Sequence, residues 1–153
     1  MVYECERQRQ IAAPAKRVWE WLTVPQHVFG LNVFHRNAEF PEAGLHKGSI
    51  IFIQHCFFGV YHQERFARIR AVRPYFLSWG EFAARGRDCF PHSQSFTIIP
   101  IHPRQCRIVN QLRGKFVLPG APYWLHPIYR FVGAWILDDE NAKIAQACSG
   151  VRK

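Results

Sequence analysis

Hydrophobic and polar residues alternate over most of this chain, and helical spacing occurs only near its two ends. The run 2–11 alternates weakly and predicts a strand. Immediately after it, Val18 and Leu22 lie one helical turn apart, and Pro14 suits the first turn of that helix. Pro25 ends the helix, and a second short helical turn is expected at about 26–29.

Six further strands are predicted in the middle of the chain, with Gly59 at a tight reversal between two of them. Their expected ranges are 32–40, 49–58, 60–72, 76–84, 93–99 and 105–118. In the last strand, Ile108, Asn110 and Leu112 share one face, while Arg107 lies on the other. One apolar face and one basic face predict an antiparallel sheet that is packed on one side only.

The C-terminal part returns to helical spacing and predicts one long helix at 122–147. Its apolar residues recur every three to four positions: Leu125, Ile128, Tyr129, Val132, Trp135 and Ile136. We expect this helix to cover the apolar face of the sheet, as the only element large enough to do so. The predicted fold is therefore α+β: an antiparallel sheet of about seven strands covered by a long C-terminal helix, with two short helices after the first strand.

Length and composition fit one folded domain over residues 1–153. Hydrophobic residues make up 48% of the chain, which excludes disorder, and no apolar run approaches the roughly 20 residues of a membrane helix. The first residues lack the apolar core of a secretory signal. The five cysteines are odd in number and scattered. We therefore expect a cytoplasmic protein with reduced cysteines.

The net charge of +9 is concentrated in the middle of the sequence. Between Glu64 and Lys115, ten basic residues face only three acidic ones. Such a surface attracts an anionic membrane, an acidic protein or nucleic acid, but Arg is also a common solubilising residue on exposed strands. Few aromatic residues are interleaved with these arginines, which disfavours nucleic acid.

The segment Ile11-Ala-Ala-Pro-Ala-Lys-Arg-Val-Trp-Glu-Trp-Leu-Thr23 resembles the opening of the START-like superfamily, also called SRPBCC or Bet v 1-like. The order of elements along the whole chain agrees with this resemblance. Val24-Pro25 stands where these proteins usually have Asp-Pro. The resemblance implies a helix-grip fold: a curved antiparallel sheet around the long C-terminal helix, with a cavity between them. Members bind lipids, sterols, quinones or polyketides, and some cyclise polyketides, so fold alone does not select a function.

We expect no metal ion and no other cofactor. None of the eight histidines forms a His-Glu-x-x-His motif, and no His is followed by another His five residues later. That second spacing belongs to the iron site in the related domains of Rieske oxygenases. Cys89 and His92 match only half of a Rieske cluster motif, so the sequence spacing predicts no metal ligands.

One polar cluster is a candidate for acid–base catalysis. His55 and His62 flank the Gly59 reversal, and Tyr61 and Glu64 lie beside them. These four residues would form a catalytic site if they pointed into the cavity. They would be an exposed hairpin end if they pointed outward.

The leading hypothesis is a protein that binds or carries a hydrophobic small molecule without transforming it. The candidate ligand-binding residues are those expected on the inner face of the sheet and on the long helix: Trp79, Phe82, Phe96, Ile108, Asn110, Leu112, Tyr129, Val132 and Trp135. The alternative for the aromatic residues is that they fill the core. Two alternatives remain: an aromatase/cyclase-type enzyme that acts on a polyketide-like substrate, and an interaction module that uses the basic face.

Overall fold

The computed structural model describes residues 2–41, 44–57, 59–88, 90–115 and 126–150. The elements follow one another along the chain in this order: β1 (Val2–Ile11), α1 (Ala15–Leu22), α2 (Pro25–Gly30), β2 (His35–Glu39), β3 (Ile50–Phe57), β4 (Tyr61–Arg73), β5 (Phe76–Ala83), β6 (His92–His102), β7 (Gln105–Lys115) and α3 (His126–Cys148). This order confirms the predicted one: a strand, two short helices, six strands and a long helix.

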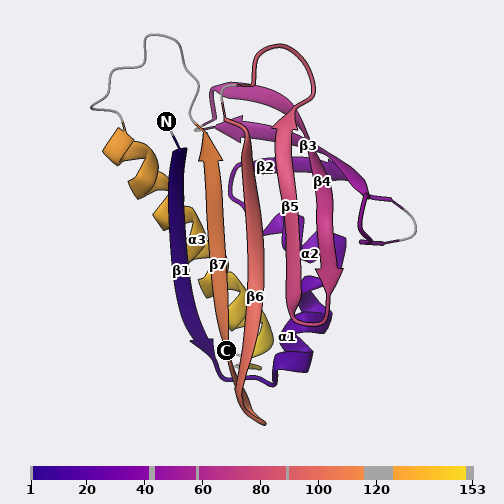
Figure 1. Cartoon of the computed structure of the whole chain (residues 1–153), viewed down its shortest axis with the longest axis vertical. Coiled ribbons are helices and arrows are strands. Elements are labelled where there is room, and N and C mark those ends of the chain that lie inside the picture. Colours follow the sequence, from indigo (N-terminus) through magenta and orange to yellow (C-terminus); the bar gives the residue numbers. More distant parts are fainter. Residues whose placement is uncertain (1, 42–43, 58, 89, 116–125, 151–153) are drawn as a thin grey trace.

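The seven strands form one antiparallel sheet in the order β1-β7-β6-β5-β4-β3-β2. Strands β2 to β7 follow one another as neighbours, and β1 then pairs with β7 along its whole length, from Val2 opposite Lys115 to Ile11 opposite Cys106. Gly59 has a φ of +77°, which allows the tight reversal between β3 and β4. The sheet curves, with the helices on one side of it (Figure 1).

Three predicted boundaries were wrong by one to three residues. The strand predicted at 93–99 continues to His102. The second strand begins at His35 rather than Asn32, because the side chain of Asn32 accepts a hydrogen bond from the backbone N–H of Phe34 and holds a turn there. Pro14 is the N-cap residue of α1 rather than part of its first turn. The long helix is described from His126, and the predicted residues 122–125 lie outside the described part of the chain.

The inner face of the sheet is covered by α1 and α2 as well as by α3, so the long helix is not the only cover. Val18 and Leu22 of α1 are fully buried in the main apolar cluster, as their spacing predicted. Helix α3 runs along β1 and β7 (Figure 1). It contributes Leu137 to a smaller cluster with Tyr3 and Ile144 to the main one. Among the described residues, no helix has the length and hydropathy to span a membrane.

Gly114 of β7 marks the tightest packing in the sheet. It lies opposite Tyr3 of β1 and His92 of β6. A Cβ atom added at Gly114 would lie 2.8 Å from the Cβ of His92 and even closer to the Tyr3 hydroxyl. A side chain at this position therefore has no room.

We expect Gly114→Ala to lower the free energy of unfolding by about 2 kcal/mol, because the added methyl group overpacks a rigid site. Urea denaturation measures this loss. Gly30→Ala is the matched control, since nothing lies within 4 Å of its added Cβ. Equal midpoints for both variants would contradict the close packing of β1 on β7.

Candidate functional site

The inner face of the sheet changes from apolar to polar toward one end. On β3, buried Ile51 and Ile53 are followed two residues later by buried His55. On β5, Leu77 and Trp79 are followed in the same way by Glu81. Neighbouring strands carry further buried polar residues near this end: Arg65 on β4, His92 and Gln94 on β6, and Asn110 on β7.

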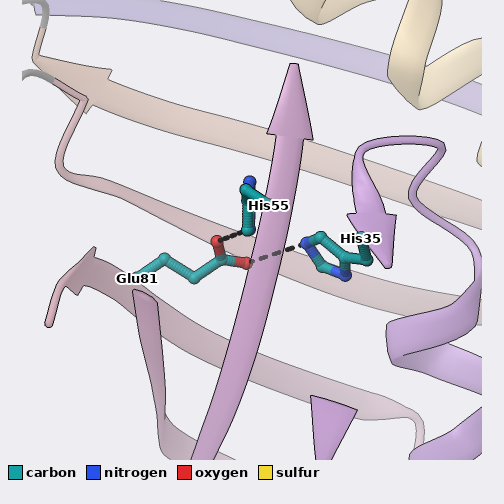
Figure 2. A group of neighbouring side chains, drawn as sticks. All are labelled: His35, His55 and Glu81. Carbon is teal, nitrogen blue, oxygen red and sulfur yellow. Dashed lines mark ion pairs between the residues drawn. The ribbon is translucent and has the colours of Figure 1, made fainter. Parts of the chain in front are cut away.

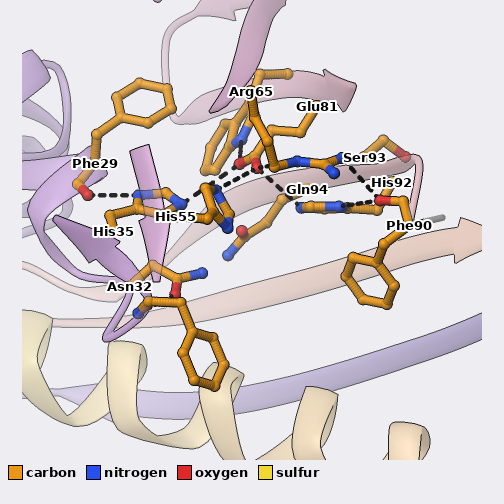
Figure 3. A network of polar contacts seen from close by, with 12 residues as sticks. Phe29, Asn32, His35, His55, Arg65, Glu81, Phe90, His92, Ser93 and Gln94 are labelled. Atoms are coloured by element: carbon orange, nitrogen blue, oxygen red, sulfur yellow. Dashed lines mark hydrogen bonds and ion pairs between the residues drawn. The ribbon is translucent and has the colours of Figure 1, made fainter. Parts of the chain in front are cut away.

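The carboxylate of Glu81 lies at the centre of this polar region and is fully buried. Its Oε2 lies 3.1 Å from Nε2 of His55 and 3.4 Å from Nε2 of His92. Its Oε1 accepts a hydrogen bond of 3.0 Å from Nε1 of Trp79 and lies 3.8 Å from Nε2 of His35. Figure 2 shows His35 and His55, and Figure 3 also His92, converging on this carboxylate from three different strands.

Two of the three imidazoles are oriented by backbone carbonyls. Nδ1 of His35 lies 2.7 Å from the carbonyl oxygen of Phe29, and Nδ1 of His92 lies 3.0 Å from that of Phe90. A carbonyl only accepts, so in each ring Nδ1 carries the proton and donates it. In the neutral form of each ring, Nε2 then presents a lone pair toward Glu81.

Arg65 supplies a permanent positive charge beside Glu81 and is itself fully buried. Its Nε lies 3.7 Å from Glu81 Oε2. Its terminal nitrogens donate to Gln63, to the carboxylate of Asp88 at 3.2 Å and to the carbonyl of Phe90 at 2.8 Å. One guanidinium thus faces two carboxylates, which leaves one negative charge for a proton or another cation to balance.

Burial and neighbouring charges act on Glu81 and His35 in different ways. Burial raises the pKa of Glu81, but His92 and His55 beside it lower that pKa more, and the net result lies well below 4.5. Burial lowers the pKa of His35 to about 4, against the opposing attraction of Glu81. At neutral pH, Glu81 is therefore a carboxylate and His35 a neutral imidazole.

A second buried acid, Glu140, belongs to α3 and contacts the inner face of the sheet. Glu140 Oε2 accepts hydrogen bonds from Nδ2 of Asn110 and Nε2 of Gln94, and Gln94 also donates to Asn110 Oδ1 at 3.0 Å. Burial raises the pKa of Glu140 to about 7, although these two amides lower it in part. Near neutral pH this carboxyl can both give up and take up a proton, which suits a general acid or base.

His35, His55 and Glu81 are also a possible set of metal ligands. Each offers one ligand atom, and the three atoms lie within 4.8 Å of one another (Figure 2). Two imidazoles and one carboxylate are donors that divalent transition metals accept.

The structure separates the four predicted catalytic residues. His55 points inward and belongs to the Glu81 cluster. His62 and Glu64 lie on β4 with exposed side chains, and Glu64 lies near Arg85. The side chain of Tyr61 lies outside the described part of the structure. The four therefore do not form one interior site, because successive residues of a hairpin face opposite sides of the sheet.

The predicted ligand-binding residues are distributed over three environments. Trp79, Phe96 and Ile108 are buried on the inner face, with Asn110 and Leu112 beside them. Phe82 does not join them: it lies on the outer face and is 40% exposed.

The three helix residues are Tyr129, Val132 and Trp135. Tyr129 and Val132 are half-buried on α3. Trp135 is 46% exposed and contacts the ring of Phe34 edge-on. Their role in binding a ligand stays a prediction.

Sequence reasoning missed Glu81, His35, Arg65, Glu140 and the inward role of His92. The alternation of inward and outward positions along each strand could have identified part of this set. Glu81 follows Leu77 and Trp79 at a spacing of two, and Arg65 precedes Ala67 and Ile69 in the same way. Polar residues in an inward register, repeated on neighbouring strands, predict a buried polar region.

The outer face carries a basic groove. Two adjoining hollows, of about 520 and about 490 Å³, share Arg70, Gly80 and Phe82. The first also includes Arg113 and Lys115, and the second Lys47 and Arg68. The predicted basic face therefore exists as a surface, while its partner stays a prediction.

Comparison with solved structures supports a START-like fold. A START superfamily protein from Mycobacterium smegmatis shares 12% identity over 97% of this chain and 99% of its own, with a TM-score of 0.71. Norcoclaurine synthase from Thalictrum flavum, solved with dopamine and hydroxybenzaldehyde, shares 13% identity over 100% of this chain and 90% of its own, with a TM-score of 0.72.

A third similar structure is the Zhui aromatase/cyclase from Streptomyces sp. R1128. It shares 12% identity over 98% of this chain and 93% of its own, with a TM-score of 0.68. No protein-family model matches the sequence, and no curated protein does. At these identities the likeness establishes the helix-grip fold only. The function has to be argued from the residues of the site.

We expect Glu140→Gln to stabilise the protein at pH 8 and to have little effect at pH 4.5. The raised pKa means that the protonated carboxyl favours folding below about pH 4.5, and that this advantage is lost as the pH rises through about 7. The isosteric amide avoids the buried charge, and the shift corresponds to about 3 kcal/mol at pH 8.

Urea denaturation of both proteins across this pH range measures the effect. Glu20→Gln is the control, because its side chain is 63% exposed. A difference between wild type and Glu140→Gln that does not grow with pH would contradict the buried, proton-binding state of Glu140.

Proposed function

We propose that this protein binds a small, largely apolar molecule with at least one polar group, in the interior between the sheet and α3. The observation that supports this most strongly is the polar set of Gln94, Asn110 and Glu140, which is buried where α3 covers the sheet. These groups would receive the polar end of the ligand.

The energetic cost of this polar set favours a role in recognition. Keeping Glu140 buried destabilises the folded protein at neutral pH, as its raised pKa indicates. Replacing buried charged groups by well-packed apolar side chains often leaves the stability of a protein unchanged or raises it. Buried positions are normally apolar, and exceptions that cost stability are typical of functional sites.

Aromatic and aliphatic side chains beside the polar set would supply the apolar contacts. The ring centroids of Trp79 and Phe96 lie 5.8 Å apart, and those of Trp79 and Phe29 lie 5.2 Å apart. Contact with a ligand would contribute roughly 25 cal/mol per Å² of apolar surface removed from water. The polar groups would add orientation.

The class of ligand that fits best is a flat aromatic, quinone or polyketide-like molecule with hydroxyl or carbonyl groups; a lipid or isoprenoid would use only the apolar part. The similar norcoclaurine synthase structure holds dopamine and hydroxybenzaldehyde, two small aromatic molecules. An apolar stripe on the first half of α3, formed by Ile128, Phe131 and Trp135, suits the approach of such a molecule.

Acid–base catalysis on the bound molecule is a second candidate function, and the pKa of about 7 at Glu140 favours it. In this case the ligand would be a substrate, and Glu140 would move a proton at its carbonyl or hydroxyl group. The similar aromatase/cyclase has the same fold. Because one fold can host many reactions, any chemistry of this chain has to be argued from its own residues.

We expect the protein to bind 8-anilinonaphthalene-1-sulfonate and polycyclic phenols and quinones, and Asn110→Leu to weaken binding of the phenols and quinones about tenfold. The loss of one hydrogen bond to the ligand accounts for this factor. Titration by fluorescence and native mass spectrometry of the purified protein measure binding. Gln111→Leu is the matched control, on the same strand but exposed.

Equal binding by both variants, or no binding of any probe, would contradict the proposal. Conversion of a bound quinone or phenol to a tautomer or other isomer, followed by its absorption spectrum and lost in Glu140→Gln, would favour catalysis over binding alone.

A further inference from the structure

The Glu81 cluster has the composition and orientation of a metal site. We propose that His35, His55 and Glu81 bind one divalent first-row transition-metal ion, such as Zn²⁺ or Fe²⁺, in the interior of the sheet. This inference goes beyond small-molecule binding under α3. It also replaces the expectation from sequence spacing that no metal site exists.

The ligand atoms are close to the separation that a metal ion requires. Metal bonds of about 2.1 Å place neighbouring ligand atoms about 3.0 to 3.5 Å apart in tetrahedral or octahedral geometry. Nε2 of His55 lies 3.1 Å from Glu81 Oε2, and Nε2 of His35 lies 3.8 Å from Glu81 Oε1. All three ligand atoms lie within 4.8 Å of one another, so small rotations of the rings suffice.

His35 provides a buried ligand atom aimed at the site. Its side chain is only 5% exposed, and its Nε2 makes no hydrogen bond among the described residues. Its Nδ1 donates to the carbonyl of Phe29, which fixes the ring with the Nε2 lone pair toward Glu81. Metal-binding histidines usually donate their second N–H to a carbonyl or carboxylate in this way.

Groups around the three ligands hold the carboxylate in place. Trp79 donates to Glu81 Oε1, and Arg65 lies beside Oε2 with its terminal nitrogens directed at Asp88 and Phe90. His92 presents its Nε2 at 3.4 Å from Glu81 Oε2 and offers a further ligand or a hydrogen-bond partner (Figure 3). Such surrounding contacts orient metal ligands and strengthen metal binding.

The charge and accessibility of the site also fit a cation. Glu81 and Asp88 together carry one more negative charge than Arg65 neutralises. A metal ion among neutral imidazoles would balance that charge without protonating a buried histidine. On the outside, a hollow of about 190 Å³ is lined by Phe29, Gly30 and His35 among others.

Two imidazoles and one carboxylate select the type of metal. Imidazole nitrogen suits Zn²⁺, Fe²⁺, Co²⁺ and Ni²⁺, whereas Mg²⁺ and Ca²⁺ require mainly oxygen ligands. Three protein ligands leave coordination positions open. A bound ion could therefore also contact a polar group of a molecule in the interior.

Titration of the metal-free protein with Co²⁺ tests the proposal, with the visible absorption of bound Co²⁺ and calorimetry as readouts. We expect one Co²⁺ per chain, competition by Zn²⁺ and none by Mg²⁺ or Ca²⁺. His35→Gln and Glu81→Gln should each weaken Co²⁺ binding at least about 100-fold, because each removes a ligand. The matched controls are His62→Gln and Glu64→Gln on exposed positions of β4, which should bind like the wild type.

Elemental analysis of protein purified without chelators provides a second measurement, with about one equivalent of a transition metal expected in the wild type and little in His35→Gln. If Glu81→Gln does not fold, as circular dichroism would show, His35→Gln decides. Failure to bind Co²⁺, or equal binding by His35→Gln and His62→Gln, would overturn the proposal. Both measurements use no organic ligand, so they are independent of the small-molecule binding proposed above.

Discussion

The buried carboxylate of Glu81 is the constraint on which the interior of this protein depends. A carboxylate without partners in such surroundings would cost many kcal/mol. Arg65, Trp79, His55 and His92 compensate for this cost from β3, β4, β5 and β6. A slip of one residue in any of these strands would turn its polar side chain outward and leave the charge unpaired. The cluster therefore favours a single strand register.

This arrangement lies inside a fold that does not by itself select a function. The START-like fold provides a sheet gripped by a helix, and such a frame can host many functions. Here one end of the inner face is apolar, with Trp79 and Phe96, while the other end holds two buried acids in different states. Glu81 stays ionised beside cationic partners, whereas Glu140 binds a proton near neutral pH. Two acids with pKa values moved in opposite directions are typical of sites that bind or transform a ligand.

The fold was predictable from the sequence because its signals are local. Alternation along the strands and the spacing of Val18 and Leu22 are visible within a few residues. The site was not, since His35, His55 and Glu81 are far apart in the sequence and meet only through strand pairing. Asn110 was recognised because its apolar neighbours lie on the same strand. Metal motifs defined by sequence spacing cannot detect ligands that three separate strands supply.

A double-mutant cycle between Arg65 and Glu81 measures the central interaction most directly. Arg65→Met alone should lower the free energy of unfolding by about 3 kcal/mol or more, because it leaves Glu81 and Asp88 without their shared cation. The double variant with Glu81→Gln should recover part of that loss, with an interaction energy of at least about 2 kcal/mol. The exposed pair Lys16–Glu20 serves as the reference and should give less than about 0.5 kcal/mol. Additive effects at Arg65 and Glu81 would contradict an interior organised around this buried charge.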